Sequence, residues 1–375
     1  MNVTIVGAGN MGLAMTGYIA ARGKADVILF TGKNVLENGA LRVRDVEKAE
    51  TWRTRNFRCT DDPRTAFPEA DMVFVTYPAF LRKGFLERYG GYLKKGAFLG
   101  FVPGYGGAEY ACGKLIDRGV RILGFQRVPY VARASADEAG WTAGILSRKS
   151  RLFLGAIPFS ETREASRRVE SLLDIPVQPL KEYLSITLAP SNPLLHITGL
   201  YHVFKNYEKG QAFDRQLRFY EEWDDEASEM LFAYDNELQN ICKALAPLDM
   251  SEVVPLPVYY ESPTPEKMTR KLKSIEPFKV VPVPLKKREN GYQIDIESRM
   301  FAEDYPFGVC VIKDFAGMTG TATPTVDLLL DFYERLSGHR YFEKDGSYTP
   351  EIAATGIPGN SGLDSVEKII RFYHR

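Results

Sequence analysis

A short apolar strand at the start of the chain runs directly into a glycine-rich turn, and this pairing restricts the fold more than any other feature. Residues 3–6 read Val-Thr-Ile-Val, and Gly7, Gly9 and Gly12 follow with the spacing Gly-x-Gly-x-x-Gly before a helix-like stretch, residues 13–22. In a dinucleotide-binding unit the first glycine permits the turn, the second lets the backbone approach a pyrophosphate, and the third lets helix and strand pack closely. We therefore predict that a dinucleotide is bound by Gly7, Gly9, Asn10, Met11 and Gly12.

The residues after the next predicted strand, 26–30, indicate which nucleotide is bound. Sites that prefer NAD usually carry an Asp or Glu about twenty residues beyond the glycines, whereas a 2′-phosphate needs donors and positive charge. This chain reads Thr31-Gly32-Lys33-Asn34 there, without an acid. We predict that Thr31 and Lys33 hold a 2′-phosphate and that the cofactor is NADPH, with NADH less favoured. The alternative is that Lys33 is an ordinary exposed loop lysine.

Composition excludes several classes of partner. The chain has 375 residues, of which 45% are hydrophobic, enough for one or two ordinary cores. Its 48 basic and 48 acidic residues cancel, so we expect neither nucleic acid nor a membrane as a partner. The first predicted strand begins two residues after Met1, and no apolar run approaches the roughly twenty residues of a membrane span, so we expect a cytoplasmic protein. The four cysteines are scattered, so no disulfide framework or metal site is predicted. Whether the protein forms a homodimer stays open.

Short apolar runs recur through the first half of the chain, at residues 27–30, 72–76, 97–102, 121–125 and 151–156. This recurrence predicts an α/β domain over residues 1–185, a doubly wound Rossmann sheet. Ligands of such sheets lie beyond the carboxyl ends of the strands. We expect three loops there, 77–80, 103–107 and 126–133, to border a cleft, with Pro78 beside the cofactor. Proline and glycine clusters are also ordinary turn chemistry.

The second half of the chain changes to helical periodicity. Residues 226–245 carry apolar side chains at helical spacing, and a second helix is predicted from Thr323-Pro324 to Gly338. The segment between them, 255–292, is less regular and rich in Pro and Lys, which we interpret as solvated surface. These features predict a mainly α-helical C-terminal domain over residues 186–375.

Two segments of this second half carry candidate chemistry. Residues 189–199 contain His196, and residues 298–308 contain Glu303 and Asp304. Histidine exchanges a proton near neutral pH and suits acid/base work beside a carbonyl or imine, and a carboxylate can orient an imidazole and stabilise its cation. His202 follows on the same predicted helix and is a second candidate. The plainer alternatives are a buried core histidine and an acid that caps the next helix.

Together these motifs resemble the opine dehydrogenase family, the octopine and nopaline dehydrogenase type. The resemblance rests on Asn-x-x-x-His at residues 192–196, on aromatic-x-Glu-Asp-x-Pro-x-Gly at 301–308, and on the Thr323-Pro324 helix start. It implies that His196 is the catalytic acid/base and Asp304 its partner. The family often has Pro directly after the histidine, where this chain has Ile197.

The family reaction implied by this resemblance joins the amino group of an amino acid to a 2-oxo acid and reduces the resulting imine with NADPH. Such a site must hold two carboxylates, for which arginine is well matched. The candidate substrate-binding residues are Asn192, Arg133, Arg299 and His202. Surface ion pairing is the alternative for both arginines. Two other functions stay open: a reductase of the ketopantoate or hydroxy-acid type, and a non-catalytic NADPH-binding sensor.

Overall fold

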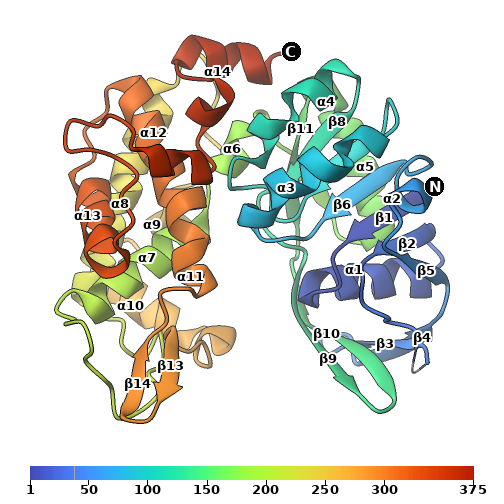
Figure 1. The fold of residues 1–375 in the computed structure, drawn as a ribbon, viewed down its shortest axis with the longest axis horizontal. Coiled ribbons are helices and arrows are strands. Elements are labelled where there is room, and N and C mark those ends of the chain that lie inside the picture. The colour runs from blue at the N-terminus through green and yellow to red at the C-terminus, as the bar shows by residue number, and fades with distance from the viewer. Residues whose placement is uncertain (38) are drawn as a thin grey trace. The chain divides into compact units, whose positions relative to one another are not determined.

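The computed structural model describes residues 1–37 and 39–375, and it separates the chain into two compact units. The first unit comprises Met1–Thr187 together with Ile370–Arg375, and the second comprises Leu188–Ile369. Figure 1 shows the sheets in the first unit and a helical second unit. The sequence predicts a boundary after residue 185 and a second domain that runs to residue 375. The structure differs in the final segment, which returns to the first unit.

The first unit is built on an eight-stranded sheet with the order β12-β11-β8-β7-β6-β1-β2-β5. Its strands are β1 (Asn2–Val6), β2 (Asp26–Phe30), β5 (Phe57–Thr60), β6 (Met72–Val75), β7 (Phe98–Phe101), β8 (Arg121–Phe125), β11 (Leu152–Ile157) and β12 (Val177–Pro179). The pairs from β5 across to β8 are parallel, and β11 runs antiparallel to β8. The sheet extends from β1 in both directions, through β2 and β5 on one side and through β6, β7 and β8 on the other. The predicted doubly wound Rossmann sheet is therefore confirmed.

Helices connect these strands and cover the sheet. They are α1 (Asn10–Ala21), α2 (Pro63–Ala66), α3 (Ala79–Tyr89), α4 (Gly113–Asp117), α5 (Thr162–Leu173) and α6 (Leu184–Thr187). Helix α5 buries Ala165, Val169 and Leu172 along one face. Helix α1 ends where Gly23 adopts a φ of +62°, a conformation in which glycine is unstrained.

A second sheet of four strands, in the order β4-β3-β10-β9, is not predicted from the sequence. It consists of β3 (Leu41–Asp45), β4 (Glu50–Thr54), β9 (Tyr130–Asp137) and β10 (Gly140–Arg148). The prediction that residues 126–133 form a loop is wrong in its second part, since β9 begins at Tyr130. This sheet was missed because its strands are partly exposed and carry charged outward positions in place of a continuous apolar run.

Helix α1 lies between the two sheets (Figure 1), and a buried ion pair fastens the arrangement. The Arg148 guanidinium carbon lies 4.2 Å from the centre of the Tyr18 ring of α1. Its Nε donates to Asp45 at 2.7 Å, and the Asp45 side chain is fully buried. Arginine suits this position because it stacks on aromatic rings and pairs with a carboxylate at the same time. The second sheet is therefore attached to the helix that follows the glycine turn.

The end of α14 (Val366–Tyr373) is anchored in the first unit by a buried glutamate. Glu109 lies in the short helix Ala108–Cys112 and is fully buried. Its Oε1 accepts a hydrogen bond from Thr187 and another from the Tyr373 hydroxyl at 3.1 Å, and its Oε2 has no partner among the described residues. Burial raises the pKa of Glu109 from 4.5 to about 7, although both hydrogen bonds and the charge of Arg82 oppose this.

This raised pKa predicts that the first unit loses stability as the pH rises from 4.5 to about 7. In that window the folded protein retains a proton that the unfolded chain releases, so unfolding becomes more favourable with increasing pH. The loss should reach about 3 kcal/mol above pH 7. Urea unfolding between pH 4 and pH 8 measures it, and Glu109→Gln should flatten the profile. Exposed Glu138 provides a control, because Glu138→Gln should keep the wild-type slope. An unchanged slope in Glu109→Gln would contradict the assignment.

The second unit is mainly α-helical, as predicted. Its main elements are α7 (Ser191–Phe204), α8 (Asp225–Ala244), α9 (Leu256–Tyr259), α10 (Pro265–Ser274), α11 (Arg299–Ala302), α12 (Cys310–Thr319), α13 (Pro324–Ser337) and the hairpin β13 (Leu285–Arg288) to β14 (Gly291–Ile294). Residues 255–292, predicted to be irregular, contain α10, which Thr264 caps. No helix among the described residues is long and apolar enough to cross a membrane.

Helix α13 begins at Pro324, as predicted, but its cap comes from elsewhere. Thr323 occupies the N-cap position without a capping side-chain hydrogen bond. The buried Glu237 carboxylate of α8 instead accepts from the backbone N–H groups of Thr325 and Val326, at 2.7 and 3.0 Å. A carboxylate at a helix N-terminus also interacts favourably with the helix dipole. This contact fixes α13 against α8.

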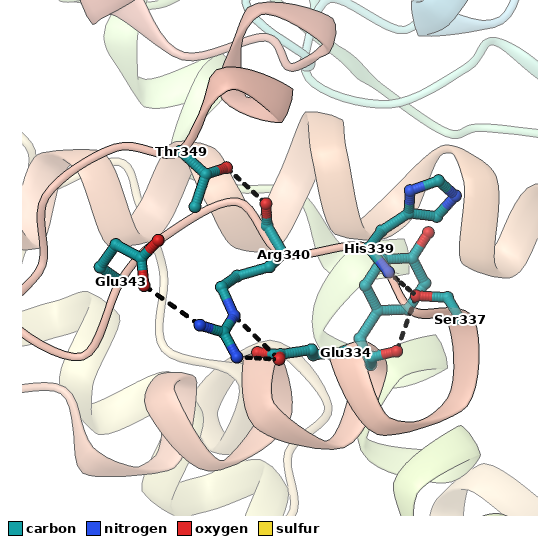
Figure 2. A network of polar contacts seen from close by, with 7 residues as sticks. Glu334, Ser337, His339, Arg340, Glu343 and Thr349 are labelled. Carbon is teal, nitrogen blue, oxygen red and sulfur yellow. Dashed lines mark hydrogen bonds and ion pairs between the residues drawn. The ribbon is translucent and has the colours of Figure 1, made fainter.

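The chain after α13 is held by a surface network (Figure 2). Arg340 donates to Glu334 at 2.8 Å and to Glu343 at 3.1 Å. The Ser337 hydroxyl donates to the Tyr333 carbonyl and accepts from the His339 backbone N–H. Exposed pairs of this kind each contribute little on their own, but together they tie the turn at Gly338 back onto α13. His339 therefore belongs to a structural network, and the sequence assigns it no chemistry.

Candidate active site

Helix α7 positions His196 on its second turn. The helix starts after Pro190, and Leu194, Leu195 and Ile197 around the histidine are buried. The His196 side chain retains 19% exposure, so part of it is accessible. Ile197 continues the helix without a break, although proline often follows the histidine in the family that the sequence resembles.

Asp304 lies at the start of a π-helical turn, Tyr305–Val309, directly after α11. Its Oδ2 is 2.7 Å from His196 Nδ1, although the two residues are 108 positions apart in the sequence. The Asp304 side chain accepts no capping hydrogen bond from the turn that it precedes, and its carboxylate contacts the histidine. The predicted capping alternative is therefore wrong, and the structure brings together the two residues of the predicted pair.

The electrostatics of the pair follow from burial. Burial raises the pKa of Asp304, and the hydrogen bond from His196 and its charge oppose that rise. A carboxylate that accepts from Nδ1–H fixes the tautomer of an imidazole and leaves Nε2 to exchange a proton. Within the described residues, His196 Nε2 has no hydrogen-bond partner. The arrangement can therefore serve as an acid or a base at Nε2.

The other predicted substrate residues of this unit lie on α7 and α11, the helices that carry His196 and precede Asp304. Arg299 is 67% exposed and its Nε donates to Glu303 at 2.8 Å. Asn192 is exposed in the first turn of α7, inside the helix and not at its cap. His202 Nε2 lies 3.4 Å from Asp224. None of these contacts shows a substrate role, and those roles stay predictions.

His202, Asp224 and Glu226 bring ligand atoms within 4.8 Å of one another. Two of these residues are otherwise engaged, because Asp224 caps α8 and Glu226 pairs with Lys205 at 2.5 Å. Capping and ion pairing explain the cluster without a metal ion.

The glycine turn of the first unit has the geometry that its spacing predicts. Gly7 has a φ of +100°, and its N–H donates to the Phe30 carbonyl at 3.0 Å. A Cβ on Gly12 would stand 1.8 Å from the Gly7 carbonyl oxygen, whereas a Cβ on Gly9 would have no atom within 4 Å. Gly9 occupies the N-cap of α1 and supplies no capping side chain. The first N–H groups of α1 therefore meet an open space suited to an anion.

Lys33 reaches back from the end of β2 to this turn. Its Nζ donates to the Ala8 carbonyl at 3.3 Å and lies 5.1 Å from the centre of the Trp141 ring of β10. The Thr31 hydroxyl accepts from the Lys33 backbone N–H at 3.1 Å. These contacts place the ammonium beside the glycine turn, and its role in nucleotide binding stays a prediction. Trp141 was missed from the sequence because its strand was not predicted.

The remaining predicted residues of the first unit border the same turn or lie close to it in the fold. Asn10 Oδ1 accepts from the backbone N–H of Ala134 on β9 at 2.9 Å. Arg133, the preceding residue, is exposed on β9. The prediction that it lies on a loop after β8 is therefore wrong. Pro78 occupies the N-cap of α3, immediately after β6, and Met11 packs partly buried against the core.

The two units match different family models. Residues 179–337 match the model described as NAD/NADP octopine/nopaline dehydrogenase, alpha-helical domain, and residues 3–124 match that of ketopantoate reductase PanE/ApbA. Octopine dehydrogenase of Pecten maximus is 24% identical, over 99% of this chain and 98% of its own length. The match of the helical domain and the relative from Pecten maximus support the opine dehydrogenase family.

Two further comparisons cover most of the chain. The protein y4xO of Sinorhizobium fredii is 29% identical over 87% of this chain and 92% of its own length. The solved structure of octopine dehydrogenase with NADH and L-arginine matches with a TM-score of 0.87 at 24% identity, and covers 98% of this chain and 97% of that one. The structural match shows that the fold is shared over the whole chain.

Proposed function

We propose that this protein is an NADPH-dependent opine dehydrogenase. The observation that carries the proposal is the His196–Asp304 pair, which joins residues 108 positions apart at 2.7 Å within the unit that matches the family's helical domain. The substrates would be a 2-oxo acid and an amino acid, or an amine derived from one. The product would be an N-(1-carboxyalkyl) amino acid.

In the proposed reaction, His196 supplies a proton to the substrate. The amine nitrogen attacks the 2-oxo carbon, and the carbonyl oxygen leaves as water after it has taken up protons. Protonated Nε2 of His196 would supply one of these protons and polarise the carbonyl or the imine. Buried Asp304 would hold the imidazole in orientation and stabilise its cation. Bound NADPH would supply the hydride that reduces the imine carbon.

The residues of the first unit fit a dinucleotide. Space at Gly9 and the uncapped N-terminus of α1 suit the pyrophosphate, and Gly7 and Gly12 shape the turn that presents them. Lys33 and Thr31 would hold the 2′-phosphate. Because the solved octopine dehydrogenase is described with NADH, the preference for NADPH rests on the residues of this chain alone.

A spectrophotometric assay tests the proposed reaction. Oxidation of NADPH is followed with pyruvate and other 2-oxo acids, with and without a panel of amino acids and amines. Oxidation that requires the amine supports opine synthesis. Oxidation by the oxo acid alone would show a reductase of the ketopantoate or hydroxy-acid type, and binding without oxidation would show a sensor; either result would overturn the proposal.

The cofactor preference has its own test in Lys33→Ala. Loss of a charge-assisted contact to a 2′-phosphate should raise the KM for NADPH by about tenfold to a hundredfold. The KM for NADH, which has no 2′-phosphate, should stay within about twofold of the wild type. Exposed Lys114 gives a matched control, since Lys114→Ala should change neither value. An equal rise for both cofactors would contradict the assignment of Lys33.

A further inference from the structure

Besides Asp304, the ring of Phe219 packs against the imidazole of His196. The Phe219 ring centre lies 5.9 Å from that of His196, with the ring planes at 83°. Phe219 is 1% exposed and comes from the segment between α7 and α8. Asp304 contacts Nδ1 at one edge of the imidazole, and Phe219 packs edge-to-face against the ring. Two contacts from different segments restrict the ring more than one does.

Gly199 makes this approach of Phe219 possible. It lies on α7 one helical turn beyond His196, where side chains share a face. A Cβ on Gly199 would stand 2.4 Å from Phe219 Cζ and 3.0 Å from Trp223 Cζ3. Glycine is a poor residue for the middle of a helix, so its presence here is explained by the close packing of Phe219. A larger residue would displace the ring that borders His196.

Phe219 is itself anchored from behind. Its backbone N–H donates to the Val281 carbonyl at 2.8 Å. Its ring packs against Trp223, whose Nε1 donates to the Ser228 hydroxyl at 2.9 Å. Ser228 is 2.8 Å from the Thr269 hydroxyl of α10. These contacts with α8 and α10 fix the ring of Phe219. A fixed ring can in turn restrict the orientation of the His196 imidazole.

We propose that Phe219, admitted by Gly199, is a positioning residue that holds the His196 imidazole with Nδ1 toward Asp304 and Nε2 toward the substrate. This inference rests on the proposed function, in which His196 Nε2 transfers the proton. Simple core packing would place Phe219 equally deep, but it would not couple a change at Gly199 to the state of His196. The proposal therefore predicts an effect on the histidine and not only on stability.

The test uses Gly199→Ala, Phe219→Leu and the double variant in the full-length protein. Each single variant should lower kcat about 100-fold, because small displacements of a catalytic group have effects of this size, while KM for NADPH is unchanged. The double variant should be no slower than the slower single variant, since leucine leaves room for the added methyl group. Gly317→Ala is the matched control: Gly317 lies in helix α12 with no atom within 4 Å of a built Cβ. It should retain wild-type kcat.

A second readout does not depend on turnover. The proton on Nδ1 that His196 donates to Asp304 should give a downfield proton NMR signal, which should weaken in both single variants and persist in Gly317→Ala. Unchanged kcat and an unchanged signal in the folded Gly199→Ala and Phe219→Leu variants would overturn the inference. If Gly199→Ala does not fold, Phe219→Leu alone decides. Loss of the signal in a protein that shows no amine-dependent turnover would refute the proposed function and leave the positioning role standing.

Discussion

His196→Ala should lower the turnover of amine-dependent NADPH oxidation by about 10²- to 10⁴-fold, the contribution of a positioned general acid or base. The structure gives the reason, because His196 Nδ1 is engaged by Asp304 at 2.7 Å and Nε2 is the ring nitrogen left for proton transfer. The proposed cofactor site lies in the other unit, on the glycine turn. The dissociation constant for NADPH, measured by fluorescence titration, should therefore stay close to that of the wild type.

Asp304→Asn should produce a loss of similar order through a different cause. An amide oxygen can still accept from Nδ1–H, but it lacks the charge that stabilises an imidazolium, and a flipped amide would donate to Nδ1 and impose the wrong tautomer. The variant is nearly isosteric, so the buried site should remain packed. Its kcat should fall while the KM for NADPH is retained.

His339→Ala provides the control for both variants, since His339 is 58% exposed and pairs with Glu351 at the surface. It should have wild-type kcat. If His196→Ala or Asp304→Asn turned over amine and 2-oxo acid at the wild-type rate, the dyad would have no catalytic role. Equal losses in all three variants would instead indicate a general effect on folding, which circular dichroism would detect.

The parts of the fold that the sequence predicts well are those whose residues act locally. The strand before Gly7, the helix behind Gly12 and the long helix α8 each follow from patterns within one segment. The pairing of His196 with Asp304 depends on two segments that are distant in sequence, and it was reached only through the resemblance to a family. No periodicity could have indicated it.

Other features were missed because their causes are nonlocal or two-sided. The sheet of β3, β4, β9 and β10 is partly exposed and lacks the apolar runs that mark buried strands. Glu237 caps α13 from another helix, and nothing near Thr323 in the sequence points to it. The pairing of Arg299 with Glu303 is different, because their i, i+4 spacing is visible in the sequence and could have lowered the expectation that Arg299 binds substrate.

Gly12→Ala should both destabilise the first unit and abolish NADPH binding. The added Cβ would stand 1.8 Å from the Gly7 carbonyl oxygen, a backbone atom that cannot rotate away. Either α1 or the turn must move, and overpacking of this kind typically costs about 1–3 kcal/mol, occasionally more. We expect the upper end of that range, seen as a lower midpoint in urea unfolding. Displacement of α1 also removes the helix N-terminus from the phosphate position.

Gly9→Ala separates the steric cost from the binding role. A Cβ there meets no atom within 4 Å, and the residue has a φ of −91°, which alanine adopts without strain. Stability should therefore stay within about 1 kcal/mol of the wild type. The methyl group would nevertheless occupy the place of the pyrophosphate, so NADPH affinity should fall about 100-fold or more, the cost of a few lost charge-assisted hydrogen bonds. A Gly9→Ala protein that is as stable as the wild type and binds NADPH equally well would show that the nucleotide does not approach this turn. If Gly12→Ala then lost stability while Gly9→Ala did not, the glycine turn would serve only the packing of α1 against β1.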